Sequence, residues 1–258
     1  MKLSSLLTVS ALASVMASPV VMADDTVSPA QKKQFEQIVH DYLVKNPEVL
    51  MEASQALQAK QQATMQKEAK SAISQNADQL LAGKLAVAGN PKGTVTVVEF
   101  FDYQCSHCKQ MKPVMIDLLK KNTNVRVVYK EFPIFGKNSE VASRATLAAA
   151  MQGKYIPLHE ALLQTDKSLD KDTVMAAAKT VGLDMTKLKK DMDSKEVTDE
   201  LAANRKLAEA MHLMGTPAFI VFATPTGTLK AGTEPSFIPG GTSFEALQAL
   251  VDKANAGK

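Results

Sequence analysis

Cysteine is scarce in this sequence: 258 residues contain only two, Cys105 and Cys108, with two positions between them. A pair so close together cannot cross-link distant parts of the chain, so the sequence is not that of a disulfide-stapled domain. A bond between the two would close a very small loop. We therefore expect a chemical role for the pair rather than a structural one.

The chain also lacks a strong charge of either sign. Lys and Arg number 30 and Asp and Glu number 27, which gives a formal net charge of +3. Nucleic-acid binding needs a concentrated basic surface that neutralises phosphates, so we expect no nucleic-acid partner. The length suffices for one large domain or two small ones with a sizeable core.

An apolar run at the N-terminus predicts an export signal. A basic start precedes this run, which extends to about Met16, and small residues lead up to a cleavage site after Ala23. This is the layout of a secretory signal peptide, residues 1–23. An uncleaved membrane anchor is the alternative, and it is disfavoured because Ser18-Pro19 ends the run before full bilayer length. We expect the mature protein to work outside the reducing cytosol.

Residues 24–83 are predicted to be helical, with few large apolar residues. Ser28 followed by Pro29 is typical of a capped helix start. From Glu48 to Gly83 glycine and proline are absent, and an unbroken helix there would be roughly 50 Å long. The thin apolar stripe fits either a solvated spacer or a helix that pairs with a copy of itself. We favour self-association, as a homodimer because two-fold assemblies are the commonest.

A strand, a helix and a second strand are predicted next. Residues 94–101 are β-branched and aromatic, which is typical of a buried strand. An amphipathic helix follows Cys105, and residues 125–129 form the second strand. A βαβ unit of this kind places its two strands parallel.

Residues from about 138 to 214 are almost all helical in pattern, beginning with an alanine-rich helix at Ser139. Strand character returns at 218–222, a turn leads to a short strand near Leu229, and Ser243 begins the last helix. Without the helical block, a single small sheet remains. The pattern therefore predicts an α/β domain, residues 84–258, with an all-helical insertion.

The two cysteines are predicted to lie at the start of the helix that follows the first strand. Free backbone N–H groups and the helix dipole stabilise a thiolate at Cys105. Cys108 lies one turn further on, from where it can attack a mixed disulfide, and His107 can favour the thiolate. A Cys-x-x-Cys in this position of an exported protein predicts a redox-active pair.

Metal binding is the main alternative use of these thiols. A structural zinc ion needs four ligands, of which the pair supplies half, and the histidines outside the motif are isolated. Cu(I) prefers soft thiolates, and the chain has 13 methionines, most of them at positions that core packing explains. We expect no cofactor. We keep as alternatives a copper-binding or copper-tolerance protein and a structural surface protein with a vestigial pair.

Two further features point to redox chemistry. Glu99 lies in an otherwise apolar strand, where a carboxyl group would have a raised pKa and could relay protons during thiol exchange. Its alternative position is a strand edge that faces water. Gly215-Thr216-Pro217 precedes the later strand and suggests a locked turn, with a cis bond, whose free backbone groups could hold an extended substrate.

The run from Val98 to Cys108, together with Gly215-Thr216-Pro217, resembles the DsbA-like thioredoxin-fold oxidoreductases of the bacterial periplasm. The resemblance extends from about Thr94 to the C-terminus. It implies a thioredoxin fold with an inserted helical domain, preceded by an N-terminal helical dimerisation arm. It also implies roles for individual residues: an exposed nucleophile at Cys105, a resolving thiol at Cys108, a buried acid at Glu99, a cis-proline at Pro217 and a basic residue near the acid at Lys130.

Two positions depart from the best-known oxidases of that family. Ser106-His107 replaces Pro-His, and Thr216 is similar to the disulfide isomerases, as is the N-terminal arm. We therefore expect a periplasmic thiol:disulfide oxidoreductase, isomerase-capable and dimeric, with a pure oxidase as the alternative. Its partners would be reduced or misoxidised exported proteins and a membrane redox protein.

Overall fold

The computed structural model describes residues 27–82, 85–166 and 168–257. The predicted signal peptide lies outside them. The chain divides into two compact units, with the division between Gln58 and Ala59. Among the described residues, no helix is both long enough and apolar enough to cross a membrane. The predicted domain boundary at residues 83–84 stays a prediction.

The N-terminal residues are helical, as the sequence predicts. Helix α1 (Pro29–Lys45) begins after Ser28, whose hydroxyl accepts a hydrogen bond from the Gln31 backbone in a capping box. Helix α2 (Glu48–Gln75) and the short helix α3 (Ala77–Leu81) follow. The predicted long helix is therefore interrupted, at Asn76. No residue of α1 is buried, whereas Ala69 and Ile73 near the end of α2 are.

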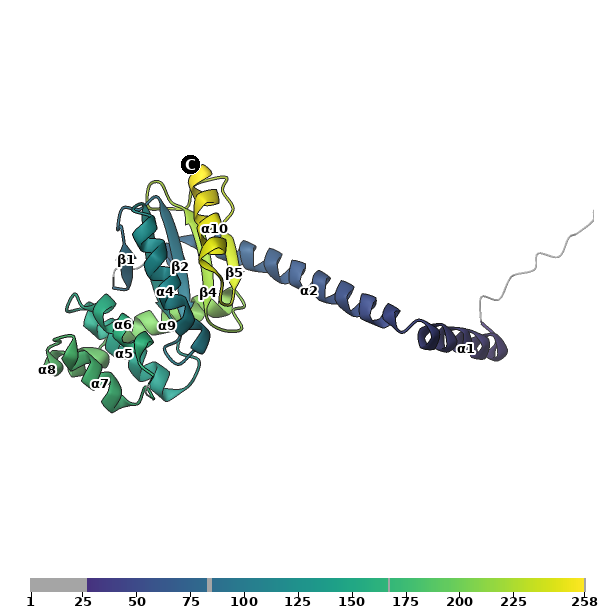
Figure 1. The fold of residues 1–258 in the computed structure, drawn as a ribbon, viewed down its shortest axis with the longest axis horizontal. Coiled ribbons are helices and arrows are strands. Elements are labelled where there is room, and N and C mark those ends of the chain that lie inside the picture. Colours follow the sequence, from purple (N-terminus) through teal and green to yellow (C-terminus); the bar gives the residue numbers. More distant parts are fainter. Residues whose placement is uncertain (1–26, 83–84, 167, 258) are drawn as a thin grey trace, which may run out of the picture. The chain divides into compact units, whose positions relative to one another are not determined.

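Five strands form one sheet in the order β1-β3-β2-β4-β5 (Figure 1). They are β1 (Val87–Gly89), β2 (Val95–Phe101), β3 (Val125–Glu131), β4 (Ala218–Ala223) and β5 (Ser236–Pro239). Strands β2 and β3 are parallel, as predicted, and the other three pairs are antiparallel. The strand expected near Leu229 is wrong, because that residue lies in a loop packed against the core and the strand begins at Ser236.

Seven helices complete the second unit. They are α4 (Ser106–Lys121), α5 (Lys137–Ala150), α6 (Tyr155–Gln164), α7 (Lys171–Thr180), α8 (Met185–Met192), α9 (Lys195–Ala210) and α10 (Phe244–Ala256). Helices α5 to α9 form the predicted insertion between β3 and β4, and Figure 1 shows them grouped beyond one end of the sheet. The predicted start of α5 at Ser139 is wrong: the helix begins at Lys137, and the Ser139 hydroxyl donates to Asp102 at 2.7 Å.

The sheet separates two apolar clusters, because alternate side chains along a strand point to opposite faces. On one face Val97, Phe101 and Tyr129 pack with α4, α10 and the insertion. On the other, Phe100 and Val128 pack with the end of α2, with α3 and with the end of α9. The predicted class is confirmed: this is a thioredoxin fold with a helical insertion and a preceding helical arm.

Candidate active site

The two cysteines lie where β2 gives way to α4. Cys105 is the N-cap of α4 with an extended backbone, and Cys108 lies in the first turn, fully buried. Both are free thiols. In its thiol form Cys105 donates from Sγ to the carbonyl oxygen of Thr216 at 3.2 Å, and the Thr216–Pro217 peptide bond is cis, as predicted. The fold thus brings together two segments that are more than 100 residues apart.

Cys105 is less accessible than the sequence predicts. Only 3% of the residue is exposed, although the resemblance implies an exposed nucleophile. The carbonyl group of Thr216 lies against its sulfur and covers it. Cys105 is still the more accessible of the two thiols, because Cys108 has no accessible surface at all.

The surroundings give the two thiols opposite acidities. Hydrogen bonding from Cys108 lowers the pKa of Cys105 to about 5, against the opposing effect of burial. The side chain of Thr216 and the backbone N–H groups of Cys108 and His107 also lower it. Burial raises the pKa of Cys108 far above its usual range, and its hydrogen bond to Cys105 adds to the rise. At neutral pH the pair is therefore a thiolate at Cys105 and a thiol at Cys108.

Glu99 is buried in the central strand of the sheet. Strand β2 has β3 on one side and β4 on the other, so the alternative of a water-facing edge is excluded for this residue. Burial raises the pKa of Glu99 to about 8, and the charge of Cys105 adds to the effect. Its carboxyl group lines a cavity of about 40 Å³ together with Tyr129, His159 and Glu160. A space of this size can hold a water molecule, so Glu99 has room to exchange a proton.

His107 and Lys130 differ from what the sequence suggests. The His107 side chain is exposed, and its backbone N–H group is what contacts Cys105; an effect of the imidazole stays a prediction. The placement of Lys130 near the acid is wrong. Strand alternation directs it to the opposite face from Glu99, where its Nζ donates to the carbonyl oxygens of Gln79 and Ala82.

Asp102 is a structural residue of the site that the sequence reading missed. It is fully buried and accepts hydrogen bonds at 2.7 Å from the Gln104 N–H, the Ile134 N–H and the Ser139 hydroxyl. The loop before Cys105 is thereby fixed to the start of the insertion. An aspartate that directly follows a strand and accepts from the backbone N–H two residues later is typical of an Asx turn. This pattern in the sequence could have predicted the role of Asp102.

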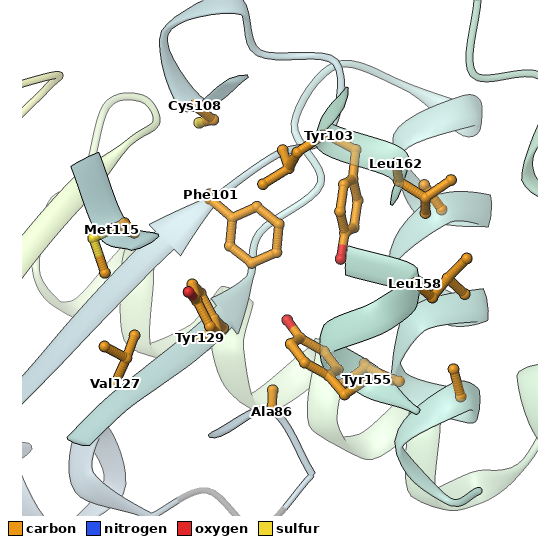
Figure 2. Close-up of a cluster of buried hydrophobic side chains, with 14 of the residues drawn as sticks. Ala86, Phe101, Tyr103, Cys108, Met115, Val127, Tyr129, Tyr155, Leu158 and Leu162 are labelled. Carbon is orange, nitrogen blue, oxygen red and sulfur yellow. The ribbon is translucent and has the colours of Figure 1, made fainter. Parts of the chain in front are cut away.

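A second buried acid, Glu131, was also missed. The hydroxyl groups of Tyr103 and Tyr155 each donate to its Oε1 at 2.9 Å, and burial raises its pKa to about 8. Tyr103 also contacts His159 Nδ1 at 3.1 Å. Figure 2 shows the rings of Phe101, Tyr103 and Tyr155 gathered in the buried cluster that also contains Cys108. The signal is weak in sequence, because a charge at the end of a strand usually marks exposure.

The described residues offer no ready metal centre. Nowhere in that part of the chain do three or more His, Cys, Asp or Glu side chains gather closely enough to hold an ion. The thiolate of Cys105 and the thiol of Cys108 remain the only soft ligands in the sequence besides methionine.

Two family models match the chain. The DSBA-like thioredoxin domain matches residues 96–252, which is more than half of the sequence. The copper resistance protein ScsC N-terminal domain matches residues 31–64, within α1 and α2.

Curated relatives match between half and two thirds of the chain. The thiol:disulfide interchange protein DsbA of Bordetella parapertussis is 32% identical over 134 residues, which are 50% of this chain and 64% of that protein. The Na(+)/H(+) antiporter NhaA 1 of Salinispora arenicola is 29% identical over 173 residues, 66% of this chain but only 25% of that protein. The chain thus spans between a quarter and two thirds of the length of these relatives.

Solved structures match larger shares of the chain. BcfH of Salmonella enterica Typhimurium is 31% identical with a TM-score of 0.74, over 87% of this chain and 96% of that one. A thioredoxin-like oxidoreductase of Silicibacter pomeroyi is 39% identical with a TM-score of 0.63, over 70% of this chain and 98% of that one. With its paired thiols at the start of α4, the chain belongs to the DSBA-like thioredoxin domain family.

Proposed function

We propose that this protein works in the periplasm, where it forms and isomerises disulfides in exported proteins through Cys105-Ser106-His107-Cys108. The proposal depends on the opposite pKa shifts of the two thiols, downward for Cys105 and upward for Cys108. The lowered pKa of Cys105 keeps a nucleophile ready at neutral pH, while the raised pKa of Cys108 keeps the second thiol protonated until it is needed. The predicted signal peptide supports export.

Isomerisation needs no external oxidant or reductant. The Cys105 thiolate attacks one sulfur of a wrongly paired client disulfide, so that a Cys105–client disulfide forms and the other client sulfur leaves as a thiolate. That client thiolate, or another one formed by exchange within the client, then attacks the client sulfur of the mixed disulfide, and Cys105 leaves as a thiolate. Bonds formed and broken are equal in number, and no electrons are gained or lost overall.

Oxidation of a client uses the same site in its disulfide form. A client thiolate attacks the Cys105–Cys108 bond, and a second client thiol displaces Cys105, which leaves both cysteines reduced. A membrane redox protein must then accept two electrons to restore the bond. If isomerisation dominates, the membrane partner instead supplies electrons that keep the pair reduced. The Thr216 residue beside the site, which resembles that of the isomerases, favours the second case.

The arm supports a homodimer. Phe35, Ile38, Val39 and Tyr42 of α1 are each more than half exposed within a single chain. Apolar side chains on one helix favour burial against another copy of the same helix. Two active sites held by one pair of arms would suit misfolded clients that contain several wrong bonds. Light scattering of the full chain tests this, and a monomeric mass would contradict it.

Refolding of ribonuclease tests the activity. We expect the full chain to restore activity to scrambled ribonuclease and, when oxidised, to form disulfides in reduced ribonuclease. Cys105→Ala should abolish both reactions. Activity on the reduced protein alone would contradict the isomerase part and leave a pure oxidase; turnover by Cys105→Ala would contradict the assigned nucleophile.

Copper binding is the second candidate, because the family model that matches residues 31–64 is described as a copper resistance protein. A thiolate at Cys105 beside the Cys108 thiol is a soft site that Cu(I) prefers. Anaerobic titration with Cu(I), with glutathione as competitor, tests this function. Binding no tighter than that of glutathione would remove it.

A further inference from the structure

A groove of about 510 Å³ adjoins the active site on the side of Thr216 and Pro217. It is lined by the stretch of α2 that contains Met65, by Leu213 and Met214 in the segment after α9, and by Phe237 of β5. The volume lies within the range of about 300–1,000 Å³ that is usual for ligand sites. The groove is therefore large enough to receive side chains of a bound peptide.

The wall that α2 contributes is firmly attached to the sheet. Ala69 and Ile73, one and two turns beyond Met65, are buried in the same apolar cluster as Phe100. Nearby, Lys70 Nζ lies 3.5 Å from a carboxylate oxygen of Glu234 in the loop before β5. Burial of the two apolar side chains provides most of the attachment, since an exposed ion pair contributes little. The groove thus exists as a formed surface in the single chain.

The lining is unusually apolar for an exposed surface. Met214 is 93% exposed and Met65 is 60% exposed. In the described part of the second unit only two other large hydrophobic side chains are exposed, Phe135 at 53% and Ile134 at 37%. The carbonyl group of Phe135 accepts a hydrogen bond from Gln104, the neighbour of Cys105. Phe135 thus contacts the residue before Cys105, and Met214 lies two residues before Thr216, which contacts the Cys105 sulfur.

We propose that this groove binds large apolar side chains next to the reacting cysteine of an unfolded or misfolded client, so that α2 contributes directly to client selection. The inference rests on the proposed function. The groove is continuous with the thiol-exchange site, because Thr216 both lines the groove and contacts Cys105 Sγ. A client chain joined to Cys105 must lie along Thr216, and its neighbouring residues then reach the groove.

The chemistry of the lining favours unfolded clients. Methionine side chains are flexible and polarisable, and surfaces rich in them accept apolar side chains of many shapes. Gln62 and Gln66 line the same stretch of α2 as neutral polar residues, and Glu68 adds one acidic group there. A correctly folded client keeps its large apolar residues inside, whereas a misfolded one exposes them beside its cysteines. The groove therefore selects misfolded clients over correctly folded ones, whatever their amino-acid sequence.

The test uses two synthetic peptides, each with one cysteine blocked as a disulfide with glutathione. Leu and Phe flank the cysteine in one, and Ser and Asn flank it in the other. The rate of attack by the reduced full chain is measured for both peptides and for oxidised glutathione. Variants Met65→Gln and Met214→Gln, singly and together, keep the length of the side chain and remove its apolar character. Met51→Gln, at an exposed methionine of α2 outside the groove, is the control.

We expect wild type to react about tenfold faster with the apolar peptide, and the double variant to lose most of that preference. Rates with oxidised glutathione and the preference of Met51→Gln should stay unchanged. A preference for the apolar peptide that survives in the double variant would overturn the proposal. If the oligomeric mass of the variant changes and the preference does not, the groove instead binds a second copy of the chain. No reaction of wild type with any of the three disulfides would instead overturn the proposed function.

Discussion

Cys108 is the main determinant of the acidity of Cys105, and this can be tested by two substitutions at one position. Cys108→Ala removes the hydrogen-bond donor, while Cys108→Ser keeps an O–H group in nearly the same place. In both variants Cys105 is the only thiol, so its titration can be followed without interference. The two variants differ in one donor, which makes them a matched pair.

The size of the effect follows from the contacts around Cys105. Its pKa is about 5, against 9.0 for an unperturbed cysteine, and hydrogen bonding from Cys108 is the largest cause. A hydrogen bond to a charged group stabilises it by about 1.5–3 kcal/mol, and one pKa unit corresponds to about 1.4 kcal/mol. Cys108→Ala should therefore raise the pKa of Cys105 to between about 6 and 7. Cys108→Ser should stay near 5.

The assay is the ultraviolet absorbance of the thiolate as a function of pH. At pH 6, about nine tenths of Cys105 should be ionised in Cys108→Ser, and about half or less in Cys108→Ala. The rate of alkylation by iodoacetamide at pH 6 should follow the same order. Equal pKa values in the two variants would refute the hydrogen bond as the cause, and would leave the backbone N–H groups at the start of α4 as the remaining source.

Two further predictions concern buried acids. The pKa of Glu99 is about 8 in the folded protein and 4.5 when unperturbed. Between these pH values the folded state keeps a proton that the unfolded chain has lost. The free energy of unfolding therefore falls as the pH rises from 4.5 to 8. Glu99→Gln should therefore stabilise the reduced protein relative to wild type by up to about 5 kcal/mol at pH 9 and by little at pH 4.5, as measured by urea unfolding. A difference that is independent of pH would contradict the buried ionisation. Asp102→Ala should lower the free energy of unfolding by about 3 kcal/mol at pH 7, because it leaves buried donors unpaired. The control Asp117→Ala, at an exposed position, should lower it by less than about 0.5 kcal/mol. Equal urea midpoints for the two variants would contradict the role of Asp102.

Much of the fold could be predicted because its signals are local. The β-branched run before Cys105 predicts β2, and Asp170, Asp184, Ser194 and Ser243 each cap the helix that follows them, as their positions suggest. The features that were missed depend on contacts across the chain. Strand β1 has only three residues and is defined by its pairing with β3, which no local pattern reveals.

The residues of the active site also fall into two groups, those with a local sequence signal and those placed by contacts across the chain. The positions of Cys105, Cys108 and Pro217 follow from spacing and from resemblance, and Glu99 follows from a charge in an apolar strand. The face on which Lys130 lies depends on the register of β3, so sequence alone placed it wrongly. The cover that Thr216 places over Cys105 depends on a loop more than 100 residues away, and only the folded chain shows it.

Lys130 and Glu131 are neighbours on β3 that face opposite sides of the sheet, and this arrangement protects the strand against misalignment. A slip of one residue would move Lys130 among the tyrosine rings and take Glu131 away from the hydroxyl groups that donate to it. Each exchange would leave a buried polar group without its partner, at a cost of several kcal/mol. The two side chains together therefore favour a single alignment of β2 and β3, the parallel pair in the middle of the sheet.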